Sequence, residues 1–406
     1  MPKASLRETM NNKVPFSELE NRLKKFRAIM DVQNPDWEMA ALFSKINLYY
    51  LTGTMQEGML LIPRDSEAVL WVRRSYERAV NESFFPLIKP MDSFKDAAAG
   101  YPKMPASVHI ETEFIPLAFL QRFQKYFPIR NTLSLDFQIA SVRAVKSMFE
   151  LDLMKRSGEL HRWILEDWVP RILREGMSEV DLAGALYAEM LRTGHHGVAR
   201  FGMFDTEVVL GHIAFGESSL YPTSFNGPGG NYGMGPAVPG IGNRKTILRK
   251  GDLVFIDIGF GIEGYHTDKT MTYIFGKEPE HAVTLEHQVC VDIQDRMAEQ
   301  LRPGAVPSAI YENIMNSLSP DFIKNFMGFG SRQVKFLGHG IGLVIDEIPV
   351  IACGFDVPLQ ENMVLALEPK KGIESFGMVG IENTFIVTPR GGQCITGFSK
   401  GLIPVI

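Results

Sequence analysis

Four carboxylates and one histidine stand among apolar residues in the second half of the chain: Asp257, Asp268, Glu368, Glu382 and His339. An ionised carboxylate is costly to bury unless something compensates its charge. If the four acids converge, their mutual repulsion raises their pKa values or unfolds the site unless cations are present. Two divalent cations would balance four carboxylates, and a neutral imidazole is a common ligand of transition metals. These residue types therefore indicate a metal site.

The first two acids lie on adjacent predicted strands. The stretch GDLVFIDIGF (251–260) is apolar around Asp257, which predicts a strand buried on both faces. After several turn residues, TDKTMTYIF (267–275) alternates, with Asp268 on the same face as two threonines. We therefore expect Asp257 and Asp268 to approach each other across a hairpin. Taken alone, an aspartate beside glycine in such a run is more typical of a turn cap.

The other two acids repeat this pattern downstream. ENMVLALEPKKG (361–372) places Glu368 at the end of an apolar strand, and MVGIENTFIVTP (378–389) places Glu382 inside another. Each acid taken alone is typical of a strand end or an edge strand. A shared site explains all four acids at once, whereas the structural alternative requires a separate coincidence for each of them.

The histidine lies in KFLGHGIGLVIDEIP (335–349), where His339 is enclosed by Gly338, Gly340 and Gly342. Because glycine has no Cβ, this pattern admits close approach of backbone and of ligands to the imidazole. The alternative is a core histidine whose ring is hydrogen-bonded to the backbone. The acids elsewhere in the chain favour the ligand interpretation.

The first third of the chain is typical of a small α/β domain. An amphipathic helix predicted at 17–30 precedes short apolar runs at 39–43, 58–63 and 68–72, and a helical pattern follows at 116–127. Strands that alternate with helices in this way indicate an α/β layer arrangement.

The helical pattern at 141–173 predicts one or two long helices at the entry to a second domain. From 176 to 406, strands with few helices between them predict an α+β domain with mostly antiparallel sheet. The stretch PTSFNGPGGNYGMGPAVPGIGN (222–243) is either a flexible surface insertion or a binding loop. Its position just before the most apolar strand favours the binding loop.

Bulk properties limit the function classes. A chain of 406 residues predicts about two domains, which we place at 1–145 and 146–406. The 45% hydrophobic content and net charge of −5 are typical of a globular protein with no nucleic-acid or membrane partner. Cys290, Cys353 and Cys394 are few and widely spaced, and no segment is typical of a signal peptide or a membrane span. We therefore expect a cytoplasmic location.

The five residues occur in a pattern that resembles a known family. Together with GY-x-x-D at 264–268, GHGIGL at 338–343 and LEP at 367–369, their order resembles that of the pita-bread metallohydrolases. That family includes aminopeptidase P, prolidase, methionine aminopeptidase and creatinase. The segments INLYYLTG (46–53) and SVRAVKSMFELDLMKRSG (141–158) are similar to those that open the creatinase-type N-terminal domain and the catalytic domain.

The resemblance implies a fold and a mechanism. The fold would be a creatinase-type α/β domain followed by an α+β pita-bread catalytic domain, in a homodimer. Asp268 and Glu382 would bridge two divalent ions, with Asp257 completing one site and His339 and Glu368 the other. Mn(II), Co(II), Fe(II) and Zn(II) all suit these ligands. A water held by the ions would lose a proton and attack the peptide carbonyl, with Glu368 as general base and acid beside His339.

The resemblance also implies an Xaa-Pro aminopeptidase or dipeptidase that acts on small peptides, but several expected residues differ. Asp346 stands seven residues after His339, where proline-specific peptidases carry a second histidine, and no histidine occurs at 236–241. Met271 and Gly380 occupy positions where arginines are expected. An ionised carboxylate repels a developing oxyanion. Asp346 therefore predicts a substrate with a cationic or hydrogen-bond-donor group, or a protonated acid.

Three polar residues are candidates to replace the missing donors in substrate binding: His212, His266 and Arg200. An ordinary structural role is the alternative for each. The changed residues keep a second function open, a creatinase-like or ectoine-hydrolase-like C–N hydrolase, or a lyase acting on a small zwitterion. A non-enzymatic binding module is a third interpretation, and the intact set of five ligands argues against it.

Overall fold

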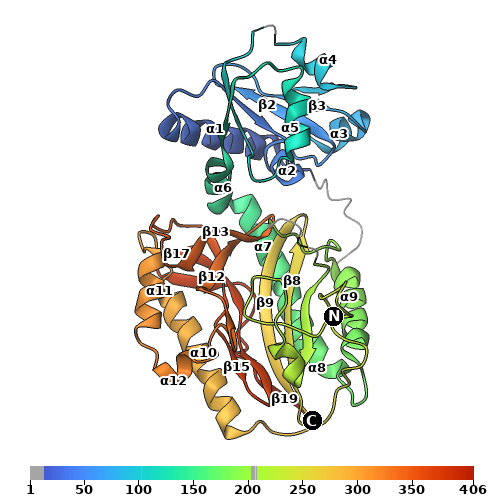
Figure 1. The fold of residues 1–406 in the computed structure, drawn as a ribbon, viewed down its shortest axis with the longest axis vertical. Coiled ribbons are helices and arrows are strands. Elements are labelled where there is room, and N and C mark those ends of the chain that lie inside the picture. Colours follow the sequence, from blue (N-terminus) through green and yellow to red (C-terminus); the bar gives the residue numbers. More distant parts are fainter. Residues whose placement is uncertain (1–12, 102, 203–205, 207) are drawn as a thin grey trace. The chain divides into compact units, whose positions relative to one another are not determined.

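The computed structural model describes residues 13–101, 103–202, 206 and 208–406. The chain divides into two compact units, Met1–Arg143 and Ala144–Ile406 (Figure 1). Within the described residues, no helix is both long enough and apolar enough to cross a membrane.

The first unit contains one mixed sheet with the strand order β4-β3-β2-β1-β5-β6. Strand β2 is antiparallel to both of its neighbours, and the other neighbouring strands are parallel. The strands are β1 (Met39–Leu42), β2 (Gly58–Pro63), β3 (Val69–Val72), β4 (Ile88–Pro90), β5 (Ser107–Ile110) and β6 (Asn131–Ser134). The helices are α1 (Phe16–Gln33), α2 (Lys45–Thr52), α3 (Tyr76–Glu82), α4 (Phe94–Ala98), α5 (Leu117–Gln124) and α6 (Asp136–Ala144). The predicted α/β character is confirmed.

Helices open the second unit. α7 (Met148–Arg162) continues through a π-helical turn (Trp163–Trp168) into α8 (Val169–Ile172), and α9 (Glu179–Thr193) follows. Ser147 separates α6 from α7, because its hydroxyl accepts the Glu150 N–H and the Glu150 carboxylate accepts the Ser147 N–H. This capping box explains why the helical stretch at 141–173 forms more than one helix.

Two sheets form the body of the second unit, with the strand orders β19-β9-β8-β7 and β13-β12-β14-β17-β18. All their neighbouring strands are antiparallel except β19 and β9, which confirms the predicted α+β class. The first sheet contains β7 (Gly211–Phe215), β8 (Leu253–Ile262), β9 (Tyr265–Phe275) and β19 (Ile403–Val405). The second contains β12 (Phe336–Ile341), β13 (Ile345–Ala352), β14 (Val364–Leu367), β17 (Asn383–Thr388) and β18 (Gly391–Cys394). Separate hairpins are formed by β10 (Gly328–Phe329) with β11 (Arg332–Gln333) and by β15 (Lys370–Ile373) with β16 (Gly377–Gly380).

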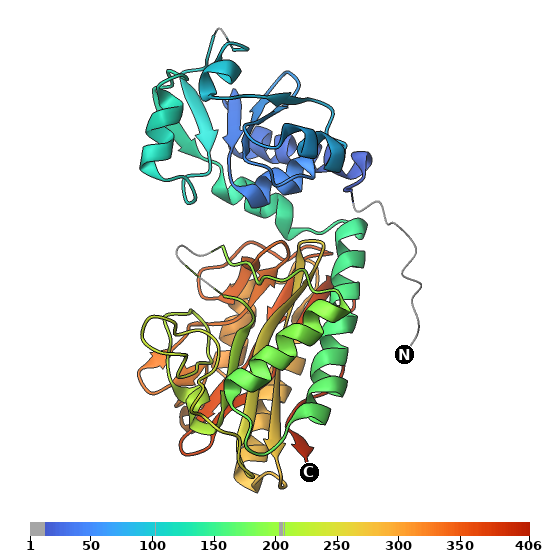
Figure 2. The ribbon, with the colours of Figure 1, turned by 90° about the vertical axis from the view of Figure 1, so that its right-hand side faces the viewer.

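Helices cover the sheets of the second unit from two sides. α7 packs on β8 and β9, whereas α10 (His281–Gln300) packs on β14, β15, β16 and β18. α11 (Pro307–Met315) packs on β13, and α12 (Pro320–Ile323) follows it in the chain. Figure 2 shows α7 and α9 side by side over the long strands. The strands between the helices are therefore buried, and so are the polar residues that they carry.

Strand β9 differs from the prediction in one respect. Its sequence alternates as expected, but every one of its residues is buried, so its polar face does not meet solvent. Thr270 on that face forms an isolated β-bridge with Glu382, which directly precedes β17 of the second sheet. The alternation therefore marks a buried polar layer between the two sheets.

Candidate metal centre

The structure brings the five predicted ligands into one buried cluster. Asp257 lies on β8, Asp268 on β9 and His339 on β12, while Glu368 directly follows β14. Glu382 lies between β16 and β17, so the prediction that it sits inside a strand is wrong in detail. The pairing of β8 with β9 places Asp268 opposite Gly259, so the two aspartates are diagonal neighbours across the hairpin.

The glycines around His339 admit the backbone of neighbouring strands. A Cβ at Gly338 would lie 2.4 Å from the Ala366 carbonyl oxygen, and a Cβ at Gly340 would lie 2.4 Å from the Ile348 carbonyl oxygen. Both distances are far below van der Waals contact. The expected close approach of backbone is therefore present, and it fixes His339 between β13 and β14.

The two ring nitrogens of His339 have different surroundings. Nδ1 lies 3.0 Å from the Gly340 carbonyl oxygen and 3.4 Å from Asp346 Oδ1. Nε2 lies 3.5 Å from Glu368 Oε1 and 3.7 Å from Glu382 Oε1. Because the acceptors around Nδ1 hold its proton there, Nε2 is the nitrogen available to a metal ion. Burial lowers the pKa of His339, but the charges of Asp346 and the two glutamates outweigh burial and raise that pKa well above its ordinary value.

A sixth residue, which the sequence interpretation missed, lies at the middle of the cluster. The ammonium group of Lys370 donates to Asp257 Oδ2 at 2.8 Å, to Glu368 Oε2 at 2.9 Å and to Glu382 Oε2 at 2.8 Å. The Lys370 side chain is 1% exposed. Burial lowers the pKa of Lys370, but the three carboxylates raise it well above its ordinary value, so the group is charged.

The two oxygens of Glu382 divide the cluster into two halves. Oε2 accepts from Lys370 and, at 2.9 Å, from the Thr270 hydroxyl. Oε1 is buried and accepts no hydrogen bond from the residues that the structure describes. Atoms of Asp268, His339 and Glu382 that can ligate a metal all lie within 4.8 Å of one another. Ligands held at about 2.1 Å from one ion lie within about 4.2 Å of one another, so a small shift suffices. An ion at this place would satisfy Oε1.

The acids respond differently to burial and to the lysine. Burial raises the pKa of Glu368 to about 8, although Lys370 opposes this shift. Burial also raises the pKa of Asp257 to about 6, again against the effect of Lys370. The pKa of Asp268 is raised well above its ordinary value by burial and by the charges of Glu382 and Asp257. For Glu382, burial raises the pKa, but Lys370 and His339 outweigh burial and lower it.

Asp346 lies beside the ring of His339. Asp346 has a positive φ of 67°, and its Oδ1 lies 3.4 Å from His339 Nδ1, whereas Glu368 and Glu382 lie near the other ring nitrogen. A carboxylate in this position orients a ligating imidazole and increases its basicity. The prediction that Asp346 serves substrate binding therefore gains a competing explanation, although the side chain is still 24% exposed.

Of the three substrate-binding candidates, only His212 lies beside the acids. It is directly opposite Asp257 in the pairing of β7 with β8, and its Nδ1 accepts from the Asn231 side chain at 2.7 Å. Burial, followed by the charge of Lys370, lowers the pKa of His212 to about 4. Asn231 belongs to the Gly/Pro-rich stretch 222–243, which contains no helix or strand beyond one isolated bridge. A Cβ at Gly229 in this stretch would lie 3.7 Å from Asp257 Oδ2, so the loop borders the cluster.

His266 and Arg200 have structural partners. His266 Nε2 accepts from the Arg200 backbone N–H at 3.3 Å, and His266 Nδ1 donates to the Gly342 carbonyl oxygen at 3.1 Å. The Arg200 carbonyl oxygen accepts from the Ile345 N–H at 2.7 Å. Both ring nitrogens of His266 are therefore engaged by protein, which argues against its role as a substrate donor.

The positions that lack the expected arginines are tightly packed. Met271 is fully buried on β9, opposite Ile256. Gly380 pairs with Lys370, and a Cβ on it would lie 2.4 Å from the Pro369 carbonyl oxygen and 2.6 Å from Lys370 Cα. Its φ of 127° also disfavours any side chain. An arginine at 380 is therefore incompatible with the backbone around Lys370.

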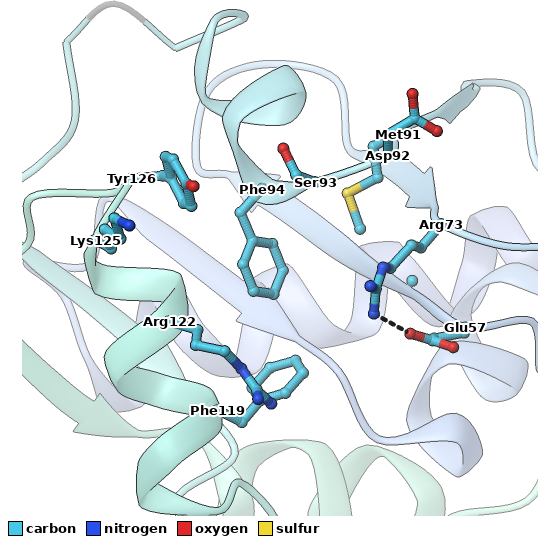
Figure 3. A pocket seen from close by; sticks show the side chains of 11 residues that line it. Glu57, Arg73, Met91, Asp92, Ser93, Phe94, Phe119, Arg122, Lys125 and Tyr126 are labelled. Carbon is cyan, nitrogen blue, oxygen red and sulfur yellow. Dashed lines mark hydrogen bonds and ion pairs between the residues drawn. The ribbon is translucent and has the colours of Figure 1, made fainter.

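A separate pocket lies in the first unit and has a volume of about 380 Å³. Aromatic rings from α4 and α5 line it together with Arg73, Arg122 and Lys125 (Figure 3). Arg73 is paired with Glu57 at 2.9 Å. None of the predicted site residues lines this pocket.

Comparisons with known proteins agree with this arrangement. Residues 152–389 match metallopeptidase family M24, and residues 22–145 match the creatinase/prolidase N-terminal domain. The chain is 28% identical over 390 residues to a protein named Xaa-Pro dipeptidase from Pyrococcus horikoshii, with 95% of this chain and 99% of that protein covered.

Solved structures share the fold. The prolidase structure from Pyrococcus horikoshii has a TM-score of 0.75 at 24% identity and covers 94% of this chain and 100% of its own. The dipeptidase PepE structure from Mycobacterium ulcerans has a TM-score of 0.78 at 20% identity and covers 97% and 99%. With its two matched domains and its buried acid–histidine cluster, the chain belongs to metallopeptidase family M24.

Proposed function

We propose that this metallohydrolase cleaves Xaa-Pro bonds of small peptides. The observation that carries the proposal is the buried group of Asp268, His339 and Glu382, with two further carboxylates held beside it by Lys370, in a chain of the metallopeptidase family. The relative named Xaa-Pro dipeptidase, which matches over nearly the full length of both chains, supports the substrate class.

The donor set fits a divalent cation. Two carboxylates and one imidazole of the M24 domain offer ligand atoms close together, and the buried Glu382 Oε1 accepts no hydrogen bond from the described residues. We propose that Asp268, His339 and Glu382 hold the ion, with Asp257 and Glu368 beside them. Mn(II), Co(II), Fe(II) and Zn(II) suit these atoms. Such an ion, when bound, lowers the pKa of water from about 15.7 toward 7 and polarises a carbonyl.

Glu368 is the proposed general base and acid. Lys370 holds its Oε2, so the carboxylate is oriented with Oε1 toward His339 Nε2. Oε1 is therefore the oxygen that takes a proton from the attacking water and passes it to the leaving amine. A carboxylate fixed within reach of both atoms contributes about 10²–10⁴-fold to the rate of such reactions.

His212 and the loop 222–243 are the proposed substrate contacts. His212 lies opposite Asp257, and its partner Asn231 comes from that loop. The partly exposed side chain of Asp346 is a second candidate, because its carboxylate would attract the ammonium group of a short peptide. This second role is compatible with the contact between Asp346 and His339.

The residues around the cluster of acids favour a second candidate function, that of a C–N hydrolase acting on a small cationic amide. Asp346 stands beside His339, and no arginine side chain fits at Gly380. A carboxylate at the rim favours a small cationic substrate, and a C–N hydrolase acting on such an amide uses the same chemistry. The two functions differ in the substrate that is turned over.

One assay separates these functions. Purified protein, freed of metal and reloaded with Mn(II) or Co(II), is tested with Xaa-Pro dipeptides, longer Xaa-Pro peptides, matched Xaa-Ala peptides and small cationic amides. We expect metal-dependent cleavage of Xaa-Pro bonds, lost in Glu368→Gln and kept in Glu361→Gln, which changes an exposed glutamate before β14. Turnover of amides alone would select the second function. No turnover of any of these substrates would contradict the proposal.

We propose a cytoplasmic location and a homodimeric assembly. The three cysteines have no disulfide partners among the described residues, which agrees with the reducing cytoplasm. A homodimer is the prediction from family resemblance, and light scattering of the purified protein tests it.

A further inference from the structure

The ammonium group of Lys370 lies among three of the four carboxylates of the cluster and donates a hydrogen bond to each of them. We propose that this chain binds a single divalent ion, at Asp268, His339 and Glu382, and that the Lys370 ammonium group permanently replaces the second ion. The inference rests on the metal-dependent function proposed above, and it changes the number of ions from the two that the sequence predicts.

The first argument is that the lysine is fully satisfied where it lies. An ammonium group has three N–H donors, and those of Lys370 reach oxygens of Asp257, Glu368 and Glu382 at 2.8 to 2.9 Å. A divalent ion that took the same three oxygens would bind them at about 2.0 to 2.2 Å and would overlap Nζ. Such an ion can enter only if the lysine leaves.

The second argument is that the backbone directs Lys370 inward. Glu368 and Lys370 are two residues apart in extended chain, so their side chains point to the same side. Lys370 then pairs with Gly380, whose missing side chain allows the two backbones to approach closely. Movement of the ammonium group out of the centre would leave a buried charge without its three partners.

The third argument is that a second position remains open beside the lysine. Glu382 Oε2 serves Lys370 and Thr270, whereas Oε1 faces His339 Nε2 and accepts no hydrogen bond from the described residues. Asp268 contributes an oxygen to the same place. The Glu382 carboxylate therefore contacts the Lys370 ammonium group through Oε2 and would contact the proposed divalent ion through Oε1.

The neighbouring lysines do not take this role. Lys269 Nζ donates to Asn383 Oδ1 at 2.7 Å and lies 3.2 Å from Glu166 Oε1. Lys371 Nζ donates to the carbonyl oxygens of Phe322 and Lys324 at 2.8 and 2.6 Å. Lys371 is also buried and adjacent in sequence, which makes it a matched control for Lys370.

The test counts ions without turnover. The native protein, Lys370→Ala and Lys371→Ala are stripped with a chelator, loaded with excess Mn(II), separated from free ions and analysed by elemental mass spectrometry. We expect one ion per chain for the native protein and for Lys371→Ala, and two for Lys370→Ala. Electron paramagnetic resonance should show an isolated Mn(II) in the native protein and an exchange-coupled pair in Lys370→Ala.

Two ions, or none, in the native protein would overturn the inference, and so would a folded Lys370→Ala that binds one ion. If Lys370→Ala does not fold, the count and the spectrum of the native protein still decide. Cleavage of Xaa-Pro peptides by a two-ion protein would refute the inference and leave the function intact. A one-ion protein without peptidase activity would do the reverse.

Discussion

Replacing Lys370 by methionine tests whether the lysine acts as a cation of the centre. Methionine keeps the apolar stem but removes the ammonium group from three buried carboxylates. In metal-free protein the carboxylates then lose their main compensating charge. We therefore expect Lys370→Met to destabilise the second unit strongly in the presence of a chelator.

The size of the effect follows from the contacts. Removal of one partner from a buried ion pair costs about 3–5 kcal/mol. The three contacts of Lys370 do not add, because a released carboxylate can instead take up a proton. For a carboxyl of ordinary pKa near 4.3, protonation at pH 7.5 costs about 4 kcal/mol, at about 1.4 kcal/mol per unit. We therefore expect a loss of about 4 kcal/mol in the free energy of unfolding.

The assay is urea unfolding followed by circular dichroism, with chelator and then with Mn(II). Addition of Mn(II) should stabilise Lys370→Met more than the native protein, because a second ion replaces the lost charge. Lys371→Met serves as the control, since it removes a buried lysine whose hydrogen bonds go to the backbone carbonyl oxygens of Phe322 and Lys324 and whose nearest carboxylate, that of Glu286, lies 3.9 Å away outside the cluster. It should gain no more from Mn(II) than the native protein does. Equal stability of Lys370→Met and native protein with chelator would refute the reasoning.

Three further changes test other parts of the structure. Asp346→Asn removes the negative charge beside His339 Nδ1 and should weaken Mn(II) binding, measured by calorimetry, about 10–100-fold. An unchanged affinity would exclude a role of Asp346 in positioning His339. His195→Asn keeps an acceptor for the Gly261 N–H, whereas burial lowers the pKa of native His195 from 6.5 to about 4. Between these two pKa values the unfolded chain binds more protons at this residue than the native protein does. The free energy of unfolding of the native protein should therefore fall by about 2–3 kcal/mol because of His195 when the pH is lowered from 7.5 to 4.5. The variant, measured in the presence of a chelator, should lack this loss. Gly338→Ala places a Cβ 2.4 Å from the Ala366 carbonyl oxygen of β14 and should lower the free energy of unfolding, measured in urea, by about 1–3 kcal/mol. An unchanged free energy of unfolding would show that β12 and β14 can move apart at this position.

Much of the centre follows from local patterns in the sequence. The apolar run around Asp257 and the turn after it predict β8 and β9, and the structure forms both strands as a hairpin. The expected approach of Asp257 and Asp268 across this hairpin is present, since the register makes them diagonal neighbours. Short-range patterns suffice here because the two strands are adjacent in sequence.

The sequence alone does not place Lys370 in the cluster of acids, because two adjacent lysines after a proline are typical of a solvated turn. The spacing from Glu368 does contain a signal, since residues two apart in extended chain share a side. What the sequence does not contain is the close approach of Gly380, which comes from β16 and fixes the direction of the side chain.

The position of Asp346 depends on irregular pairing between β12 and β13. Their register shifts at three places, and the positive φ of Asp346 turns its carboxylate toward His339. Simple alternation along a strand cannot predict such a contact. The domain boundary after residue 145 stays a prediction, close to the division of the structure after Arg143.

The most direct test is a titration of metal-free protein with Mn(II) while the release of proline from an Xaa-Pro dipeptide is measured. We predict no release without metal and a rate that rises linearly to a plateau at one ion per chain. No release at any Mn(II) concentration would contradict the proposed hydrolysis, and a plateau reached only at two ions per chain would contradict the role of Lys370 as the second cation.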